Sequence, residues 1–251
     1  MTENTRKVTV ERVNEGGKAR AEIDVVRESA LTIIVNDIEM ATLACSPAEP
    51  EYLAVGFVES QGLIKNRDDI AELDKDTPGT VRIRTRDETL DVPANLAVTS
   101  SGGRSSRIID AGRVNESRIT VTAEKVFSLM EEFDRYSRDF RKTGGVHSAG
   151  LCNEEKMVVF AEDIGRHNAI ERACGKCLLE GIPVSDLFLI TSGRVSYDIL
   201  LKAAVRSIPI LIARNSPTDL GIELAEKAGI TLLGFVRGTN MNVYTHGRRI
   251  T

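Results

Sequence analysis

The spacing of apolar positions changes once along the chain. From residue 7 to about residue 100, short runs of apolar and β-branched residues alternate with polar turns, which is typical of strands joined by hairpins. The pair Asn36-Asp37 separates two such runs and suits the positive φ angles of a tight hairpin turn. The pattern predicts strands over 8–10, 21–26, 31–35, 38–44 and 80–85.

One helix is expected among these strands. Ser46 and Pro47 are typical of a helix start, because serine caps the first turn and proline fits the first helical position. Apolar residues recur at helical spacing from 53 to 58, and Gly62 is expected to end the helix.

From Thr122 onward, helical and strand patterns alternate. Apolar residues at 126, 129, 130 and 133 predict an amphipathic helix after Thr122. Short apolar runs at 157–160, 187–190 and 230–233 then predict buried strands. We therefore expect an α/β fold (α+β overall), with a smaller N-terminal α+β domain over 1–120 and an α/β domain over 121–251.

Each of the three later strands runs into a polar turn that holds an arginine beside a glycine. These turns place Arg166, Arg194 and Arg237 at strand ends. Such a junction presents free backbone N–H groups, and arginine forms paired hydrogen bonds with phosphate oxygens. The repetition predicts an anionic, phosphate-bearing ligand, with His167 as a further contact beside Arg166.

Structural roles compete with these functional ones. Asp163 offers a helix cap and an ion-pair partner for Arg166, and Asp198 is close enough in sequence to pair with Arg194. We favour ligand binding, because Asn168, near which the helix is expected to begin, already offers a cap. The segment therefore holds more polar groups than a turn requires.

Composition and charge exclude some classes of partner. The 251 residues carry a formal net charge of −4, whereas nonspecific nucleic-acid-binding proteins are usually basic. No stretch approaches the roughly 20 consecutive apolar residues of a membrane span, and the N-terminus lacks the apolar core of a signal peptide. We expect a cytoplasmic protein that binds neither nucleic acid nor membranes.

A series of segments resembles one known family. Their order and spacing are similar to those of the FdhD/NarQ family of formate dehydrogenase accessory proteins, over essentially the whole chain. The segments are 43–47, 56–64, 143–149, 162–169, 191–196, 216–218, 234–238 and 242–245.

The resemblance implies a function and a fold. Family members are described as sulfur carriers that take sulfur from a cysteine desulfurase onto a cysteine. They pass it to the molybdenum bis-guanine-dinucleotide cofactor before that cofactor enters formate dehydrogenase. The resemblance also implies a C-terminal domain of cytidine-deaminase-like α/β fold and a cytoplasmic homodimer.

The resemblance also implies a position for the cofactor. On residue chemistry alone, Phe235 either plugs the core or offers its ring to a purine base. The family assigns this segment to the guanine-dinucleotide cofactor, for which GDP is a surrogate ligand. The predicted cofactor-binding residues are Phe235, Val236, Arg237, Gly238, Thr239 and Asn240, together with Arg166, His167 and Arg194.

One departure from the family concerns sulfur. The family's sulfur-carrying loop reads Ser-Ser-Cys-Gly-x-Cys-Gly, whereas residues 100–106 here read Ser-Ser-Gly-Gly-Arg-Ser-Ser, with Gly102 and Ser105 in place of both cysteines. A persulfide requires an ionisable thiol, so this loop is unable to carry sulfur. Three alternatives follow: cofactor binding without sulfuration, relay through another thiol, or a different nucleotide-like ligand. No catalytic residue is predicted.

The remaining cysteines are expected to be structural. Cys174 and Cys177 form a C-x-x-C pair, but both fall on the apolar stripe of the predicted helix, where cysteine acts as a small buried hydrophobe. Cys45 precedes a helix start, which lowers a thiol pKa when the sulfur faces the helix. It also continues an apolar strand, which favours burial, as for Cys152.

No zinc site is predicted. Deaminase-like folds hold zinc through an H-x-E segment and a P-C-x-x-C segment. His147 lacks the glutamate two residues on, and the segment 192–196 has no cysteine. His147 therefore either orders a loop or contacts a ligand. The alternative functions are a nucleotide-binding deaminase-like hydrolase and a divergent nucleotide-binding protein.

Overall fold

The computed structural model describes residues 4–92 and 117–251, and the loop at 100–106 lies outside them. The described residues form a mixed α/β fold with three sheets. The strands are β1 (Thr5–Asn14), β2 (Gly17–Val26), β3 (Ser29–Val35), β4 (Ile38–Cys45), β5 (Ile70–Asp74), β6 (Thr80–Thr85), β7 (His147–Cys152), β8 (Met157–Asp163), β9 (Phe188–Thr191), β10 (Ile210–Ala213), β11 (Thr231–Arg237) and β12 (Asn240–Thr245). The α-helices are α1 (Pro50–Ser60), α2 (Ala123–Tyr136), α3 (Arg138–Thr143), α4 (Arg166–Glu180), α5 (Tyr197–Ala204) and α6 (Asp219–Ala228).

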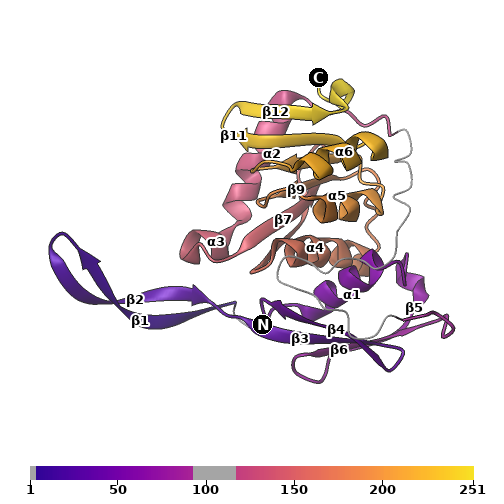
Figure 1. The fold of residues 1–251 in the computed structure, drawn as a ribbon, viewed down its shortest axis with the longest axis horizontal. Helices are drawn as coiled ribbons and strands as arrows, with labels where there is room; N and C mark the ends of the chain where they lie inside the picture. Colours follow the sequence, from indigo (N-terminus) through magenta and orange to yellow (C-terminus); the bar gives the residue numbers. More distant parts are fainter. Residues whose placement is uncertain (1–3, 93–116) are drawn as a thin grey trace.

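The largest sheet has the strand order β12-β11-β10-β9-β7-β8. Strands β9, β10 and β11 are parallel, and β7 is antiparallel to both β8 and β9. Strand β8 therefore runs in the same direction as β9. The carboxyl ends of β8, β9, β10 and β11 consequently lie at one edge of the sheet, where β7 begins (Figure 1).

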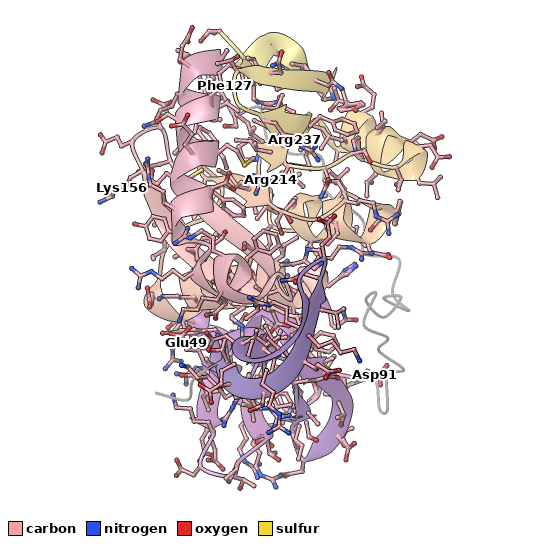
Figure 2. The ribbon with its side chains drawn as sticks, turned by 90° about the vertical axis from the view of Figure 1, so that its left-hand side faces the viewer. Glu49, Asp91, Phe127, Lys156, Arg214 and Arg237 are labelled. Atoms are coloured by element: carbon pink, nitrogen blue, oxygen red, sulfur yellow. The ribbon has the colours of Figure 1, made fainter. Side chains whose placement is uncertain are left out.

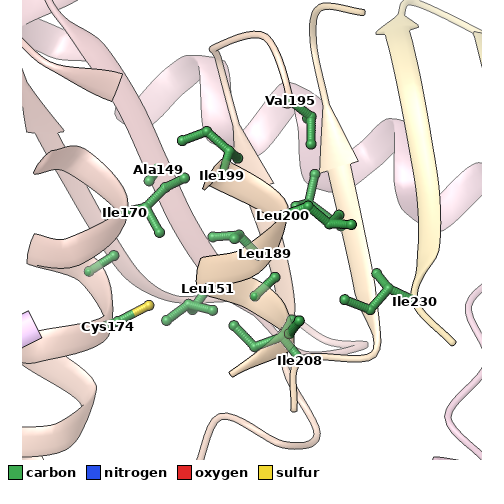
Figure 3. Packing of buried hydrophobic residues seen from close by; sticks show 14 of the residues in the cluster. Ala149, Leu151, Ile170, Cys174, Leu189, Val195, Ile199, Leu200, Ile208 and Ile230 are labelled. Atoms are coloured by element: carbon green, nitrogen blue, oxygen red, sulfur yellow. The ribbon is translucent and has the colours of Figure 1, made fainter. Parts of the chain in front are cut away.

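Helices cover both faces of this sheet. Successive strand residues point to opposite faces, so Leu189 packs among side chains of α4, α5 and α6, whereas Phe188 and Ile190 pack with residues of α2. Figure 3 shows Leu189 between Ile170 and Leu200 in the first of these cores. The amphipathic helix predicted after Thr122 is confirmed as α2, which the Thr122 side chain caps.

The smaller four-stranded sheet has the order β4-β3-β6-β5. The predicted hairpin turn is confirmed, because Asn36 and Asp37 have φ values of 48° and 63° between β3 and β4. Helix α1 covers one face of this sheet, and Leu31, Ile33 and Leu53 are among the largest buried side chains of the shared core.

The predicted start of α1 is wrong by several residues. The helix begins at Pro50, and its N-cap is Glu49. Ser46 serves a different purpose: its backbone N–H donates to Asp163, and its carbonyl oxygen accepts from Arg172 at 2.9 Å. Pro50 therefore takes the first helical position instead of Pro47, because Pro47 belongs to the segment that contacts Arg172 of α4.

Helices α1 and α4 cross in close contact and join the two sheet layers (Figure 1). A Cβ atom added at Gly56 would lie 1.9 Å from the Glu171 carbonyl oxygen, and one added at Gly175 would lie 2.0 Å from that of Tyr52. Only glycine permits this approach of the two backbones.

Buried ion pairs reinforce the crossing. Arg172 of α4 pairs with Asp163 at 2.7 Å and also donates to carbonyl oxygens before α1. Arg206, after α5, pairs with Glu171 of α4 at 2.7 Å and with Glu59 of α1 at 2.8 Å. Paired burial of this kind offsets the desolvation cost that a lone buried charge would carry.

The hairpin of β1 and β2 extends away from the rest of the molecule as a long arm (Figure 1). Ten residue pairs continue in register from Thr5–Val26 to Asn14–Gly17. Ion pairs between Lys7 and Glu22 and between Lys18 and Glu11 lie on one side of the arm. None of the described helices combines the length with the apolar character that a membrane span requires.

Candidate functional site

The sheet topology brings the three arginine-bearing strand ends to the same edge. Arg166 follows β8, Arg194 follows β9, and Arg237 closes β11. Two details of the prediction are wrong. Helix α4 begins at Arg166 rather than near Asn168, and β11 continues beyond residue 233 to Arg237 through a bulge after Gly234.

Arg166 and Arg194 are close neighbours. The Arg166 side chain lies against the turn after β9, where a Cβ atom on Gly193 would be 3.0 Å from both its Cβ and its Cδ. Burial and the nearby positive charge of Arg194 lower the pKa of Arg166, while Asp198 acts in the opposite sense. The two guanidinium groups therefore make a positively charged corner between α4 and α5.

This corner contains buried polar atoms without a hydrogen-bond partner in the described parts of the chain. They are both ring nitrogens of His167, Nε of Arg166 and Oγ of Ser196. His167 is only 4% exposed. Since buried polar groups in native proteins are almost always hydrogen-bonded, such a cluster is typical of a ligand site.

A second histidine belongs to the same corner. His147 begins β7, and its Nδ1 lies 3.3 Å from Oγ of Ser192, which also accepts the Ser148 backbone N–H at 2.9 Å. Burial, followed by the charge of Arg166, lowers the pKa of His147. Burial, followed by the charges of Lys202 and Arg166, lowers the pKa of His167 to about 3. His167 is therefore neutral at physiological pH.

The interpretation of Asp163 as a partner of Arg166 is wrong. Asp163 is fully buried and binds Arg172, and it also accepts hydrogen bonds from the Gly165 N–H and the Asn168 amide, both at 3.0 Å. These bonds shape the turn after β8. They leave the Arg166 guanidinium available at the edge.

A second group on the same edge surrounds Phe235. The ring is 42% exposed, so the alternative that it plugs the core is wrong. The Arg237 guanidinium lies 6.0 Å from its centroid, a cation–π arrangement. Phe235 has φ 53° and lies at the irregularity in the pairing of β11 with β12 between Gly234 and Arg237. Such backbone strain in a non-glycine residue is frequent at ligand sites.

Asn215 connects the two groups. Its Nδ2 donates to the Ser192 carbonyl oxygen at 2.8 Å, and its Oδ1 accepts from Arg237 at 3.1 Å. The neighbouring Arg214 pairs with Asp134 of α2 at 2.8 Å, and its carbonyl oxygen accepts from Arg237 (Figure 2). The sequence interpretation missed Arg214 and Asn215, because they follow β10 without the glycine that marked the other turns.

The other predicted cofactor residues have different surroundings. Val236 is fully buried in the core beneath α2, so only its backbone reaches the edge. Gly238 and Thr239 form the turn between β11 and β12, Asn240 begins β12, and all three are exposed. Because no ligand is present, the roles of these residues in cofactor binding stay predictions.

All four cysteines lie among the described residues, and each is buried with a free thiol. Burial, followed by the charge of Asp163, raises the pKa of Cys45 to about 11. Burial also raises the pKa of Cys152 and Cys174, and that of Cys177 to about 12. The expectation that these cysteines are buried is confirmed. Neutral, enclosed thiols are poor nucleophiles.

Potential metal ligands occur in both described ranges, 4–92 and 117–251. Within these ranges, no three side chains of His, Cys, Asp or Glu come together in a group that could hold a metal ion. His147 lies beside Ser192 and Arg166, which gives it a role in the positively charged corner.

The fold defines a mixed α/β protein with arginine side chains at one edge of its largest sheet, and comparison with known proteins specifies its family. The model of the FdhD/NarQ family matches residues 26–251. The sulfur carrier protein FdhD of Bacillus subtilis is 37% identical, and the alignment covers 95% of each chain. That of Bacillus pumilus is 36% identical, over 98% of this chain and 97% of its own.

A solved structure agrees. A protein of Desulfotalea psychrophila, provisionally assigned as a formate dehydrogenase accessory protein, superposes with a TM-score of 0.82 and 26% identity, covering 99% of this chain and 100% of its own. The chain belongs to the FdhD/NarQ family. The predicted resemblance is confirmed.

Proposed function

We propose that this chain is a formate dehydrogenase accessory protein that binds the molybdenum bis-guanine-dinucleotide cofactor without carrying sulfur itself. The observation that supports binding most directly is the single sheet edge that presents Arg166, Arg194 and Arg237 beside the exposed Phe235 ring. Membership of the family, whose relatives are named sulfur carrier proteins, supports the accessory role.

The residues present fit a nucleotide-bearing group. The Phe235 ring and the Arg237 guanidinium, 6.0 Å apart, suit the flat face of a guanine base. Arg166, Arg194 and the unpartnered polar atoms around them suit phosphate oxygens. When bound, the cofactor would supply the molybdenum–pterin chemistry, and the chain would hold its nucleotide ends.

The thiols argue against sulfur transfer. A sulfur carrier needs a thiolate that a donor reaches, and all four cysteines here are buried and have raised pKa values. The sequence places no cysteine in the remaining residues. We infer that a cysteine desulfurase is not a sulfur donor to this chain. We also propose that formate dehydrogenase is the client protein and that the chain forms a homodimer. For the C-terminal part of the chain we propose a cytidine-deaminase-like fold.

Calorimetry with GDP tests the binding role. GDP should bind, and binding should weaken as salt is added, because phosphate contacts are screened. Replacing Arg237 with Ala should cost about 1.5–3 kcal/mol of binding free energy, the range for a lost charge-assisted hydrogen bond. Arg20→Ala on the exposed arm is the matched control and should leave the affinity unchanged.

Complementation tests the sulfur role. A strain that lacks its own accessory protein should not regain formate dehydrogenase activity when this chain is expressed. Full restoration of activity would contradict the proposal. Within residues 4–92 and 117–251, no group of side chains that could hold a metal ion supports the hydrolase alternative, and hydrolysis of a nucleotide by the purified protein would be needed to revive it.

A further inference from the structure

The positively charged corner and the Phe235 group differ in character. The Phe235 group is exposed and internally bonded, since Arg237 already contacts Asn215 and the Arg214 carbonyl oxygen. The corner between α4 and α5 instead contains buried groups with unused hydrogen-bonding capacity. The two therefore have different binding chemistries, although they share an edge.

We propose that the corner between the N-termini of α4 and α5 binds one tetrahedral oxyanion of the phosphate class, held by Arg166, Arg194 and the first turn of α4. This inference rests on the proposed function only in assigning that oxyanion to a nucleotide. The shared chemistry also fits a free oxyanion such as inorganic phosphate or molybdate.

Charge supports the proposal. The Arg166 side chain lies against the turn that carries Arg194, and the charge of Arg194 contributes, after burial, to lowering the pKa of Arg166. Neither has an ion-pair partner within 4.0 Å among the residues that the structure describes. The charge of Asp198 opposes this effect on Arg166. An oxyanion between the two guanidinium groups would turn a repulsion into two attractions.

The helix ends add oriented donors. Helix α4 is 15 residues long, its N-cap is Gly165, and no side chain caps it. Its first-turn N–H groups lack intrahelical acceptors and carry the positive end of the helix dipole. Helix α5 also begins without a side-chain cap, although Ser196 occupies its N-cap position and has a buried, unpartnered Oγ.

The buried histidine is an independent sign of a ligand. His167 is the second residue of α4, is 96% buried, and both of its ring nitrogens lack a partner within the described chain. A neutral imidazole donates one hydrogen bond and accepts another without adding charge. The nearby Lys202 is engaged with Glu171, which leaves the two arginines as the available cations.

Gly193 keeps the corner tight for a steric reason. It has no positive φ, so its backbone conformation does not require glycine. A side chain there would press on Arg166 Cβ and Cδ, both 3.0 Å from the added Cβ. The glycine beside Arg194 in the sequence thus makes room for Arg166, which lies 28 positions earlier than Arg194 in the chain.

Imidazole NMR on the full-length protein tests the site directly. The chain has only three histidines, so its ¹⁵N-histidine spectrum is simple to assign. Inorganic phosphate and molybdate should each shift His147 and His167. His246 is the internal control, because it lies at the opposite edge of the sheet. There its carbonyl oxygen accepts from Thr231, and its Nε2 contacts the Glu226 carbonyl oxygen. Equal shifts at all three histidines, or no shift at any, would overturn the proposal.

Two matched variants locate the effect. Arg166→Gln should weaken phosphate binding by about tenfold or more, the scale of a lost charge-assisted hydrogen bond, whereas Arg20→Gln on the exposed arm should not change it. The His246 signal and the melting temperature report whether each variant is folded. If Arg166→Gln binds phosphate as well as the unmodified chain, the corner is not the site.

Nucleotide titrations separate this inference from the proposed function. If GDP and phosphate both shift His167 and guanosine does not, the oxyanion is the phosphate of a nucleotide. If only the inorganic ions shift it and GDP does not bind, the corner stands and the cofactor role fails. If GDP binds at Phe235 without moving His167, and phosphate also fails to move it, the cofactor role stands and the corner fails.

Discussion

At the scale of single residues, His167 combines a histidine's usual chemistry with an unusual environment. Its burial, followed by the charges of Lys202 and Arg166, lowers its pKa to about 3. The folded state therefore favours the neutral imidazole. Because of this burial, the stability of the protein should depend on the protonation of His167.

Stability should accordingly fall in acid. The pKa of His167 is about 3 in the folded chain and about 6.5 when unfolded, so the unfolded state holds one more proton between those values. The contribution of His167 to the free energy of unfolding is therefore complete above about pH 6.5. Below that pH, the contribution declines by up to about 1.4 kcal/mol per pH unit. Urea titrations of His167→Gln should show a shallower decline from pH 6.5 to 4, and those of His246→Gln should not.

The cysteine pair leads to a second prediction at this scale. Cys174 and Cys177 are 2% and 0% exposed on α4 and border a cavity lined also by Leu178 and Val184. Their thiols should react slowly with a maleimide until denaturant is added. Replacing each with Ala should cost about 1–2 kcal/mol of stability while leaving GDP affinity unchanged. Rapid labelling of the native protein would contradict structural burial.

At the scale of elements, sequence patterns predicted the alternation of strands and helices well but placed several ends wrongly. The turns that hold an arginine beside a glycine could be recognised from the sequence, because each follows directly after an apolar strand. The late start of α1 was not, because Ser46 bonds to Asp163, 117 positions away. Asn215 was missed for a similar reason: its partners are Ser192, directly after β9, and Arg237 of β11, which are 23 and 22 positions away.

The crossing of α1 and α4 gives a prediction for an element contact. Gly175→Ala raises intrinsic helix propensity by up to about 1 kcal/mol, yet its methyl group would lie 2.0 Å from the Tyr52 carbonyl oxygen. The cost of overpacking, about 1–3 kcal/mol or more, should exceed the gain in helix propensity. The two nearest groups, the Tyr52 carbonyl and the Gly56 nitrogen, belong to the backbone and have little room to move. Chemical denaturation should show a net loss of stability. Lys176→Ala, one position later and partly exposed, should be near neutral.

At the scale of the whole molecule, buried ionic contacts join parts of the chain that no local pattern relates. Arg206 reaches Glu59 across 147 positions and also pairs with Glu171. A sequence shows each charge but not its partner, so the burial of these residues was not predicted. Together with the glycine crossing, they make the two sheet layers a single packed body around α4.

The arm differs from that body, and its removal is the last prediction. Side chains of β1 and β2 are exposed or only partly buried, and a two-stranded hairpin contributes little stability by itself. Replacing residues 8–23 with an Asn-Gly turn keeps the contact of Asn4 with Asp139 at the root of the arm. The melting temperature should change by less than about 4 °C, which corresponds to about 1 kcal/mol in a chain of this size. GDP binding should be retained, because the arm contributes no residue to the sheet edge. A large loss of stability, measured by calorimetry at several protein concentrations, would instead show that the arm is part of the core of the fold.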